Sequence, residues 1–160
     1  MAMLAFVNAA CLAIPSTFIY LVKNVNLKKM VNLPDGLIPL ATPSGWMTAD
    51  LFLISLKHFV SLITVSQEKP ILLILDDHIS HISWPVVEYC KELGIILFTL
   101  PPHTPHITPP LGRGLFGHLK GELKHAHSGW MTLHPGKRIS IYDVTGLTKN
   151  PYDRRFTVAV

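Results

Sequence analysis

The sequence predicts an α/β fold in which a mixed sheet is flanked by helices. Two mainly apolar runs, Ile71–Leu75 and Ile95–Leu100, lie on either side of a segment whose apolar residues recur at helical spacing. A strand, a helix and a second strand within about thirty residues form a right-handed crossover unit with parallel strands. A third observation adds two strands, because Pro15 interrupts the uncharged stretch 1–22 and disfavours one continuous helix there.

The N-terminal stretch predicts two strands, Leu4–Ala9 and Thr17–Val22, joined by a turn around Ala13–Pro15. The alternative is a small membrane-anchored protein, because about 20 apolar residues are enough to span a bilayer. No basic segment precedes this stretch, as it would in a signal anchor. We therefore expect paired strands and no membrane partner.

A helix is expected after Thr48, which is a good N-cap, with Asp50 in the first turn where the helix dipole favours an acid. The residues of its buried stripe are Phe52, Leu56, Phe59 and Ile63. Pro70 separates this helix from the first aliphatic run. Since that run has no polar alternation, it predicts a strand covered on both faces.

The crossover helix is expected to begin after Ser83, a potential N-cap, and to end at Gly94. Its apolar face consists of Val86, Val87, Cys90 and Leu93. A last helix is indicated by leucines spaced four apart, at Leu111, Leu115, Leu119 and Leu123. Four glycines within it, Gly112, Gly114, Gly117 and Gly121, each cost a helix about 1 kcal/mol relative to alanine. We expect this helix to be the least stable element.

The composition indicates a folded domain with an anionic partner. The chain has 160 residues, of which 49% are hydrophobic and 15% are charged, so it is not disordered. Its net charge of +4 and pI of about 9.2 suit nucleic acid. The two cysteines, Cys11 and Cys90, form no disulfide framework, which favours a reducing compartment such as the cytosol or the nucleus.

Three spaced motifs carry a family resemblance. They are Ile71-Leu-Leu-Ile-Leu-Asp-Asp-His-Ile-Ser-His81, Leu100-Pro-Pro-His-Thr-Pro-His106 and Pro110-Leu-Gly-Arg-Gly-Leu-Phe116. In this order they resemble the catalytic core of the DDE-superfamily endonucleases, the pogo, Tigger and jerky-type transposases. The resemblance implies an RNase H-like mixed sheet that lacks the family's first strand. It also implies a truncated core over residues 1–127 and a trailing segment over residues 128–160.

The resemblance further implies a metal-dependent reaction. Such enzymes cut phosphodiesters with two divalent ions, Mg²⁺ or Mn²⁺, held by three acidic side chains. Asp76 matches the second acid, Gly112 stands at the place of the third, and no residue matches the first. We therefore expect Asp76 to be a vestigial catalytic and metal-binding residue, with metal bound weakly or not at all. Neither Asp77, which would face the other side of a continuing strand, nor Glu122, which lies too far along the last helix, replaces the lost ligand.

Other interpretations of the same residues stay open. Without the resemblance, Asp76 would be a strand-end carboxylate that caps the next turn through Ser80 or a backbone N–H. Two His-x-x-His pairs, formed by His78, His81, His103 and His106, could instead bind Zn²⁺.

The basic residues Arg113, Lys120 and Lys124 lie on the polar side of the last helix and are candidates for contact with phosphates. The equally simple alternative is a solvated helix face. The resulting expectation is a transposon-derived, nucleus-located domain that binds nucleic acid, DNA in the first place, uses no small-molecule cofactor and has lost cleavage. The alternatives are an active endonuclease completed by another chain or segment, and a non-enzymatic interaction protein.

Overall fold

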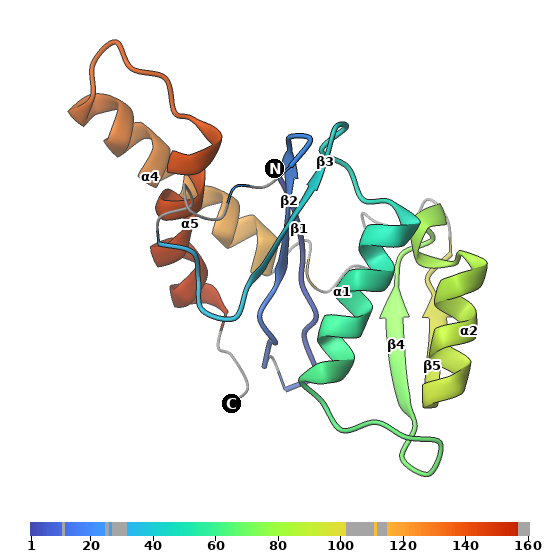
Figure 1. Cartoon of the computed structure of the whole chain (residues 1–160). Helices are drawn as coiled ribbons and strands as arrows, with labels where there is room; N and C mark the ends of the chain where they lie inside the picture. Colours follow the sequence, from blue (N-terminus) through green and yellow to red (C-terminus); the bar gives the residue numbers. More distant parts are fainter. Residues whose placement is uncertain (11, 25, 27–31, 102–110, 112–114, 157–160) are drawn as a thin grey trace. The chain divides into compact units, whose positions relative to one another are not determined.

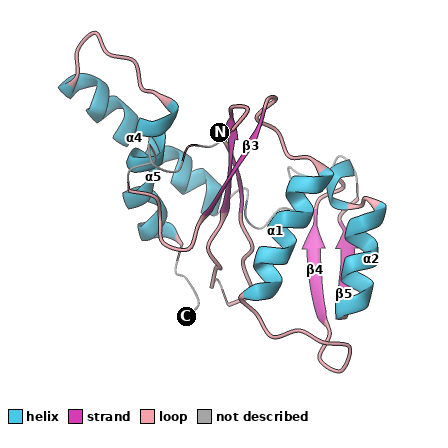
Figure 2. Cartoon of the chain, in the orientation of Figure 1, coloured by secondary structure: helices cyan, strands magenta, loops and turns pink. Residues whose placement is uncertain are grey.

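The computed structural model describes residues 1–160 except 11, 25, 27–31, 102–110, 112–114 and 157–160 (Figure 1). The described residues form five strands, four α-helices and one short 3-10 helix (Figure 2). They divide into two compact units. Unit 1 comprises residues 1–45 and 110–160, and unit 2 comprises residues 46–109. The mixed α/β class predicted from the sequence is confirmed.

Unit 1 contains a three-stranded mixed sheet and two helices. The strands are β1 (Ala2–Leu4), β2 (Thr17–Leu21) and β3 (Ile38–Thr42), in the order β1-β2-β3. Strand β1 is antiparallel to β2, and β2 is parallel to β3. The helices are α4 (Leu115–Leu133) and α5 (Ile141–Arg155), which pack against each other.

The N-terminal hairpin is present, but its turn comes earlier than predicted. Strand β1 ends at Leu4, and an isolated bridge pairs Val7 with Ala13. The Asn8 side chain accepts hydrogen bonds from the N–H groups of Ala10, at 3.0 Å, and of Leu12, at 2.9 Å. Because an Asn side chain can replace backbone partners in this way, it closes the turn between Asn8 and Leu12. The predicted turn at Ala13–Pro15 and the strand bounds Leu4–Ala9 are therefore wrong, although the pairing itself is confirmed.

The core of unit 1 is built from aromatic side chains that also carry buried hydroxyls. Phe18, Tyr20, Tyr152 and Phe156 are buried together with Leu37 and Leu119. The Tyr152 hydroxyl accepts from the Ser16 N–H at 2.9 Å and donates to Ser16 Oγ at 3.0 Å. Tyr20 and Thr145 share a second buried hydroxyl bond at 3.0 Å. These bonds join α5 to the sheet strand β2 and to the residue before it.

Unit 2 is the predicted crossover unit. It contains α1 (Ala49–Ser61), β4 (Ile71–Leu75), the 3-10 helix η2 (Ile79–His81), α2 (Trp84–Leu93) and β5 (Ile95–Thr99). Strands β4 and β5 are adjacent and parallel, as predicted, and Ile71 lies opposite Ile95 and Leu75 opposite Thr99. Thr48 caps α1 by accepting from the Leu51 N–H, and Gly94 ends α2 in the left-handed conformation at φ 79°.

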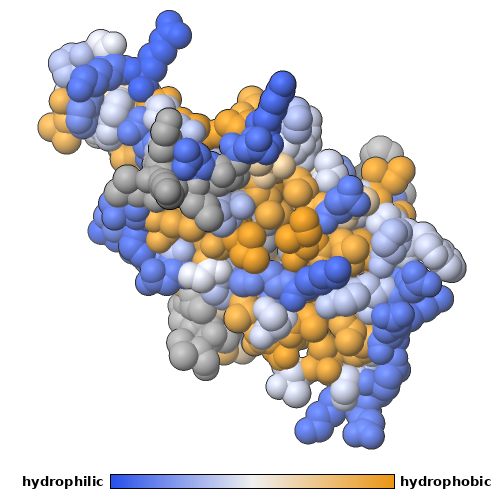
Figure 3. Space-filling view, in the orientation of Figure 1, coloured by the Kyte–Doolittle hydropathy of each residue, from blue (hydrophilic) through white to orange (hydrophobic). Residues whose placement is uncertain are grey.

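Two expectations for unit 2 need correction. Within unit 2, strand β4 is covered on one face only, and Leu72 and Ile74 on β4 and Ile96 and Phe98 on β5 are each more than half exposed. Helix α2 packs against β5, and α1 packs against α2 and η2, so the helices of this unit cover one face of a two-stranded sheet. Ile63 lies beyond the end of α1 and outside its buried stripe. Exposed apolar side chains appear as orange areas in Figure 3.

In the described part of the chain, none of the helices combines the length and the apolar character that crossing a bilayer requires. Residues 2–4 and 17–21 are strands instead. The division into a core over residues 1–127 and a trailing segment over residues 128–160 stays a prediction.

Candidate functional site

Asp76 lies directly after β4, at the carboxyl edge of the parallel pair. The Leu100 N–H donates to the Leu75 carbonyl at 2.8 Å, which keeps the end of β5 beside the end of β4. The Asp76 side chain is 68% exposed. Ligands of open α/β sheets bind outside the carboxyl ends of the strands, so Asp76 has the position and the exposure of a site residue.

His81 is the residue in contact with Asp76. Its Nδ1 lies 2.7 Å from Asp76 Oδ1, and its side chain is only 11% exposed. The distance is that of an ion pair, and the negative charge of Asp76 favours the protonated imidazole. The other side of the imidazole packs on Phe52 of α1, with 4.3 Å between the ring centroids. The ring is thus held between a helix and the strand-end carboxylate.

The surroundings lower the pKa of His81. Burial is the main cause, since it penalises the charged imidazolium, and the nearby His78 ring acts in the same direction. The negative charge of Asp76 acts in the opposite direction but does not outweigh burial. The imidazole is therefore neutral at pH 7 and offers Asp76 little compensating positive charge.

Ser80 has a different role from the one considered for it. Its Oγ lies 2.7 Å from His78 Nδ1, and its N–H donates to the same nitrogen at 3.3 Å. His78 is the N-cap of η2, and its carbonyl accepts from the His81 N–H at 2.8 Å. The suggestion that Asp76 caps this turn through Ser80 is wrong, because the His78 side chain does so. Asp76 is left facing solvent and His81.

The described residues do not fit a two-metal centre. No three His, Cys, Asp or Glu side chains converge as metal ligands in the part of the chain that the structure describes. Asp77 is exposed next to Asp76, but hard divalent ions require several oxygen ligands around one point. Gly112, Arg113 and the zinc candidates His103 and His106 lie outside the described residues. His78 and His81 do lie together, with 5.3 Å between their ring centroids.

The two described lysines of the candidate nucleic-acid set lie on α4, in unit 1. Lys120 and Lys124 are one helical turn apart, and both are exposed. Between them, Glu122 accepts from Arg155 Nε at 2.6 Å, so its charge is already paired with α5.

Comparisons with known proteins define the class. A family model described as "DDE superfamily endonuclease" matches residues 11–148. The chain therefore belongs to the DDE superfamily endonucleases, as its motifs indicated.

Two individual proteins are similar over part of their length. The chain is 37% identical over 81 residues to a protein of Cochliobolus lunatus named MFS-type transporter clz9, and this match covers 48% of the chain but 8% of that protein. It also resembles a chain in the cryoEM structure of the simian T-cell lymphotropic virus intasome in complex with PP2A regulatory subunit B56 gamma. That likeness has a TM-score of 0.39 and 19% identity, covering 64% of this chain and 34% of that one, and adds nothing to the family assignment.

Proposed function

We propose that this polypeptide is a transposon-derived DDE endonuclease domain that binds nucleic acid, DNA in the first place, and does not cleave it. The observation that carries the proposal is Gly112, which stands where the family resemblance places the third acidic ligand. Glycine has no side-chain donor for a metal. Family membership supports the endonuclease ancestry, while the loss of cleavage and the binding of DNA are our inferences.

The surroundings of Asp76 support the loss of cleavage. In this family Mg²⁺ or Mn²⁺ would be held by carboxylates, each of which supplies a large share of the protein's ligands. Asp76 contributes one carboxylate, and its described neighbour within contact distance is an imidazole rather than a second acid. Losing several kcal/mol of transition-state stabilisation removes useful activity, since about 1.4 kcal/mol corresponds to a factor of ten in rate.

The exposed lysines of α4 support the binding of nucleic acid. Lys120 and Lys124 can both meet phosphates, which is a contact without sequence readout. Arg113 extends the set in the sequence and lies outside the described residues. Because the proposed partner is DNA, we also propose a nuclear location.

A binding assay with matched charge removal tests this half of the proposal. We would measure anisotropy of a labelled DNA duplex with the unmodified chain, with Lys120→Ala/Lys124→Ala and with Lys57→Ala/Lys91→Ala. The second variant removes the same charge from unit 2. Only the α4 variant should weaken binding, and its slope of log affinity against log salt should be shallower by about 1.8, since each phosphate contact contributes about 0.9. Equal slopes for the two variants would contradict an α4 contact.

A calorimetric titration with Mn²⁺ tests the role of Gly112. Gly112→Asp should tighten Mn²⁺ binding because it restores an oxygen ligand, but it should not produce cleavage by this polypeptide.

The alternative function, an endonuclease completed by another chain or segment, is favoured by one observation: the chain spans 8% of its curated relative. Cleavage that appears when a longer polypeptide containing this segment is tested would support that alternative.

A further inference from the structure

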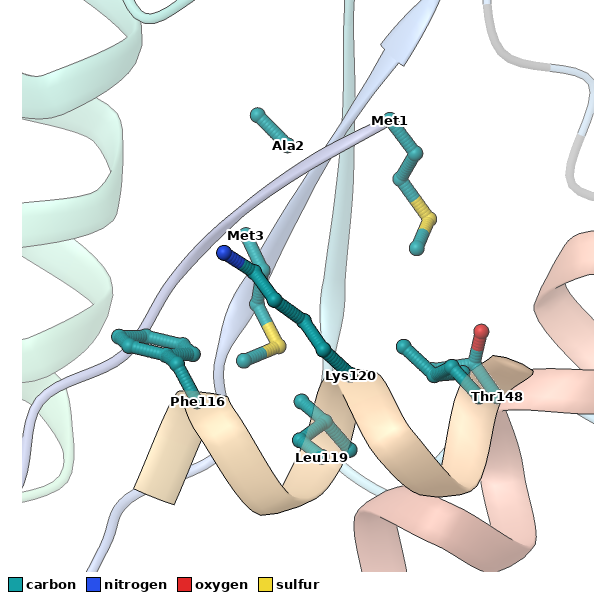
Figure 4. Close-up of a pocket in the computed structure, with 8 residues that line it drawn as sticks. Met1, Ala2, Met3, Phe116, Leu119, Lys120 and Thr148 are labelled. Carbon is teal, nitrogen blue, oxygen red and sulfur yellow. The ribbon is translucent and has the colours of Figure 1, made fainter. Parts of the chain in front are cut away.

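A pocket in unit 1 shares no residue with the Asp76 site and one residue, Lys120, with the proposed DNA contact. Its volume is about 420 Å³, which is within the range of about 300–1,000 Å³ for small-molecule sites. Strand β1 supplies Met3, α4 supplies Phe116, Leu119 and Leu123, and α5 supplies Thr148 (Figure 4). The lining is therefore aliphatic and thioether with a single aromatic ring.

The Lys120 side chain brings a positive charge to this apolar pocket, which Met1 also lines. Lys120 of α4 lines it, and its side chain extends over the opening with the terminal nitrogen on the side of Met3 and Phe116 (Figure 4). Among the ion pairs of the described residues, none includes Lys120, although Lys149, Arg155 and His81 each have an acidic partner. Thr148 adds no free donor, because its hydroxyl donates to the Val144 carbonyl at 2.6 Å.

The combination points to one class of ligand. An apolar interior next to an ammonium group without an acidic partner among the described residues favours a molecule with an apolar body and a negative head group. A nucleobase fits poorly, because its polar edges would lack hydrogen-bond partners and an unsatisfied buried polar group is costly. We propose that this pocket binds a medium-chain fatty acid anion, with the alkyl chain among Met3, Leu119 and Leu123 and the carboxylate paired with Lys120.

The two lysines allow fatty-acid binding and DNA binding to be tested separately. Lys120 belongs to both, whereas Lys124, one turn further along α4, does not line the pocket. Removal of the Lys120 side chain should therefore weaken the binding of both the fatty acid and DNA. Removal of the Lys124 side chain should weaken only the binding of DNA. Since the fatty acid is titrated without DNA, its failure to bind leaves the DNA proposal untouched, and the reverse also holds.

Isothermal titration calorimetry on the full chain tests the head group, with decanoate, decanol and decyltrimethylammonium at concentrations below micelle formation. Decanoate should bind, and the neutral and cationic analogues should bind at least tenfold more weakly. Lys120→Ala should weaken the affinity for decanoate by about tenfold, which corresponds to about 1.4 kcal/mol of binding free energy. Lys120→Arg should retain binding, and Lys124→Ala should leave it unchanged.

A chain-length series tests the apolar interior. Each methylene added from hexanoate to decanoate should tighten binding by up to about fourfold if it enters the pocket. Met3→Trp, which fills space at the exposed edge strand, should abolish this dependence, with thermal melting used to confirm that the variant is folded. Equal affinity for decanoate and decanol, unchanged affinity in Lys120→Ala, or no dependence on chain length would each overturn the proposal.

Discussion

The pair formed by Asp76 and His81 gives a sharp prediction, because the two residues differ greatly in exposure. Asp76→Asn keeps the size of the side chain and removes the negative charge 2.7 Å from His81 Nδ1. Burial lowers the pKa of His81, and the Asp76 charge opposes that effect. The variant should therefore have a His81 pKa still further below the ordinary value of about 6.5.

The expected effect on stability depends on pH. At pH 7 the imidazole is neutral and Asp76 is mostly exposed, so the pair contributes little. Exposed pairs contribute about 0–1 kcal/mol even when both members are charged, and we expect a loss of about 0.5 kcal/mol or less. As the pH falls through about 6.5, the unfolded chain binds a proton at His81 before the folded chain does. Stability should therefore decrease on acidification, and more steeply in Asp76→Asn than in the unmodified chain.

The assay is an NMR titration of the histidine ring signals from pH 4 to 8, with the His81 signal assigned by its absence in His81→Gln. Urea unfolding at pH 7 and pH 5 measures the stability of the same samples. Asp77→Asn is the matched control, since it removes a charge one residue away that is not among the causes of the His81 shift. A His81 pKa that rises or stays unchanged in Asp76→Asn, or that responds equally to Asp77→Asn, would refute the reasoning.

Four further predictions concern the stability and reactivity of the two units. Tyr152→Phe should destabilise unit 1 by about 2 kcal/mol in urea, because it leaves both buried Ser16 groups without a partner. Burial also raises the pKa of Tyr152 and Tyr20, so stability should fall above about pH 10, where unfolded tyrosines ionise first, and a flat alkaline limb would contradict this. Gly94→Ala should cost about 2 kcal/mol or more, because its Cβ would lie 2.5 Å from the Ser66 carbonyl oxygen at φ 79°. Gly136→Ala at φ 78°, with open space around it, should cost only the conformational term of about 1 kcal/mol, and equal losses would exclude the clash. Burial raises the pKa of Cys90 to about 11, so in a Cys11→Ser background the thiol should react with an aromatic disulfide at pH 8 only after unfolding, and rapid reaction of the folded chain would contradict this.

Local signals predicted the crossover unit well. The aliphatic runs of β4 and β5, the cap at Thr48 and the stop at Gly94 are each determined by a few neighbouring residues, and the structure has all of them. Helix α5 was not predicted, although Ser140 and Asp143 form a capping box whose hydrogen bonds lower the pKa of Asp143. The capping-box pattern, a serine followed three residues later by an acid, is visible in the sequence. However, Pro151 within the helix suggested a break.

Contacts between separate segments could not be predicted in the same way. The sequence predicted that Asp76 follows the end of a strand, but it did not predict the contact with His81. That contact requires η2 to pack on Phe52 of α1. Similarly, an uninterrupted apolar run forms a buried strand only if other elements pack against both faces of its sheet. The exposed face of β4 and β5 shows that periodicity alone does not supply this information.

Nicking of supercoiled DNA in Mg²⁺ and in Mn²⁺ tests the central claim most directly. Equal amounts of the purified chain and of Asp76→Asn would be incubated with plasmid, and the relaxed fraction would be measured over time. We predict that neither protein nicks above the metal-only background and that the two are indistinguishable, because one carboxylate cannot hold two ions that the family holds with three. Metal-dependent nicking by the unmodified chain that disappears in Asp76→Asn would contradict the account.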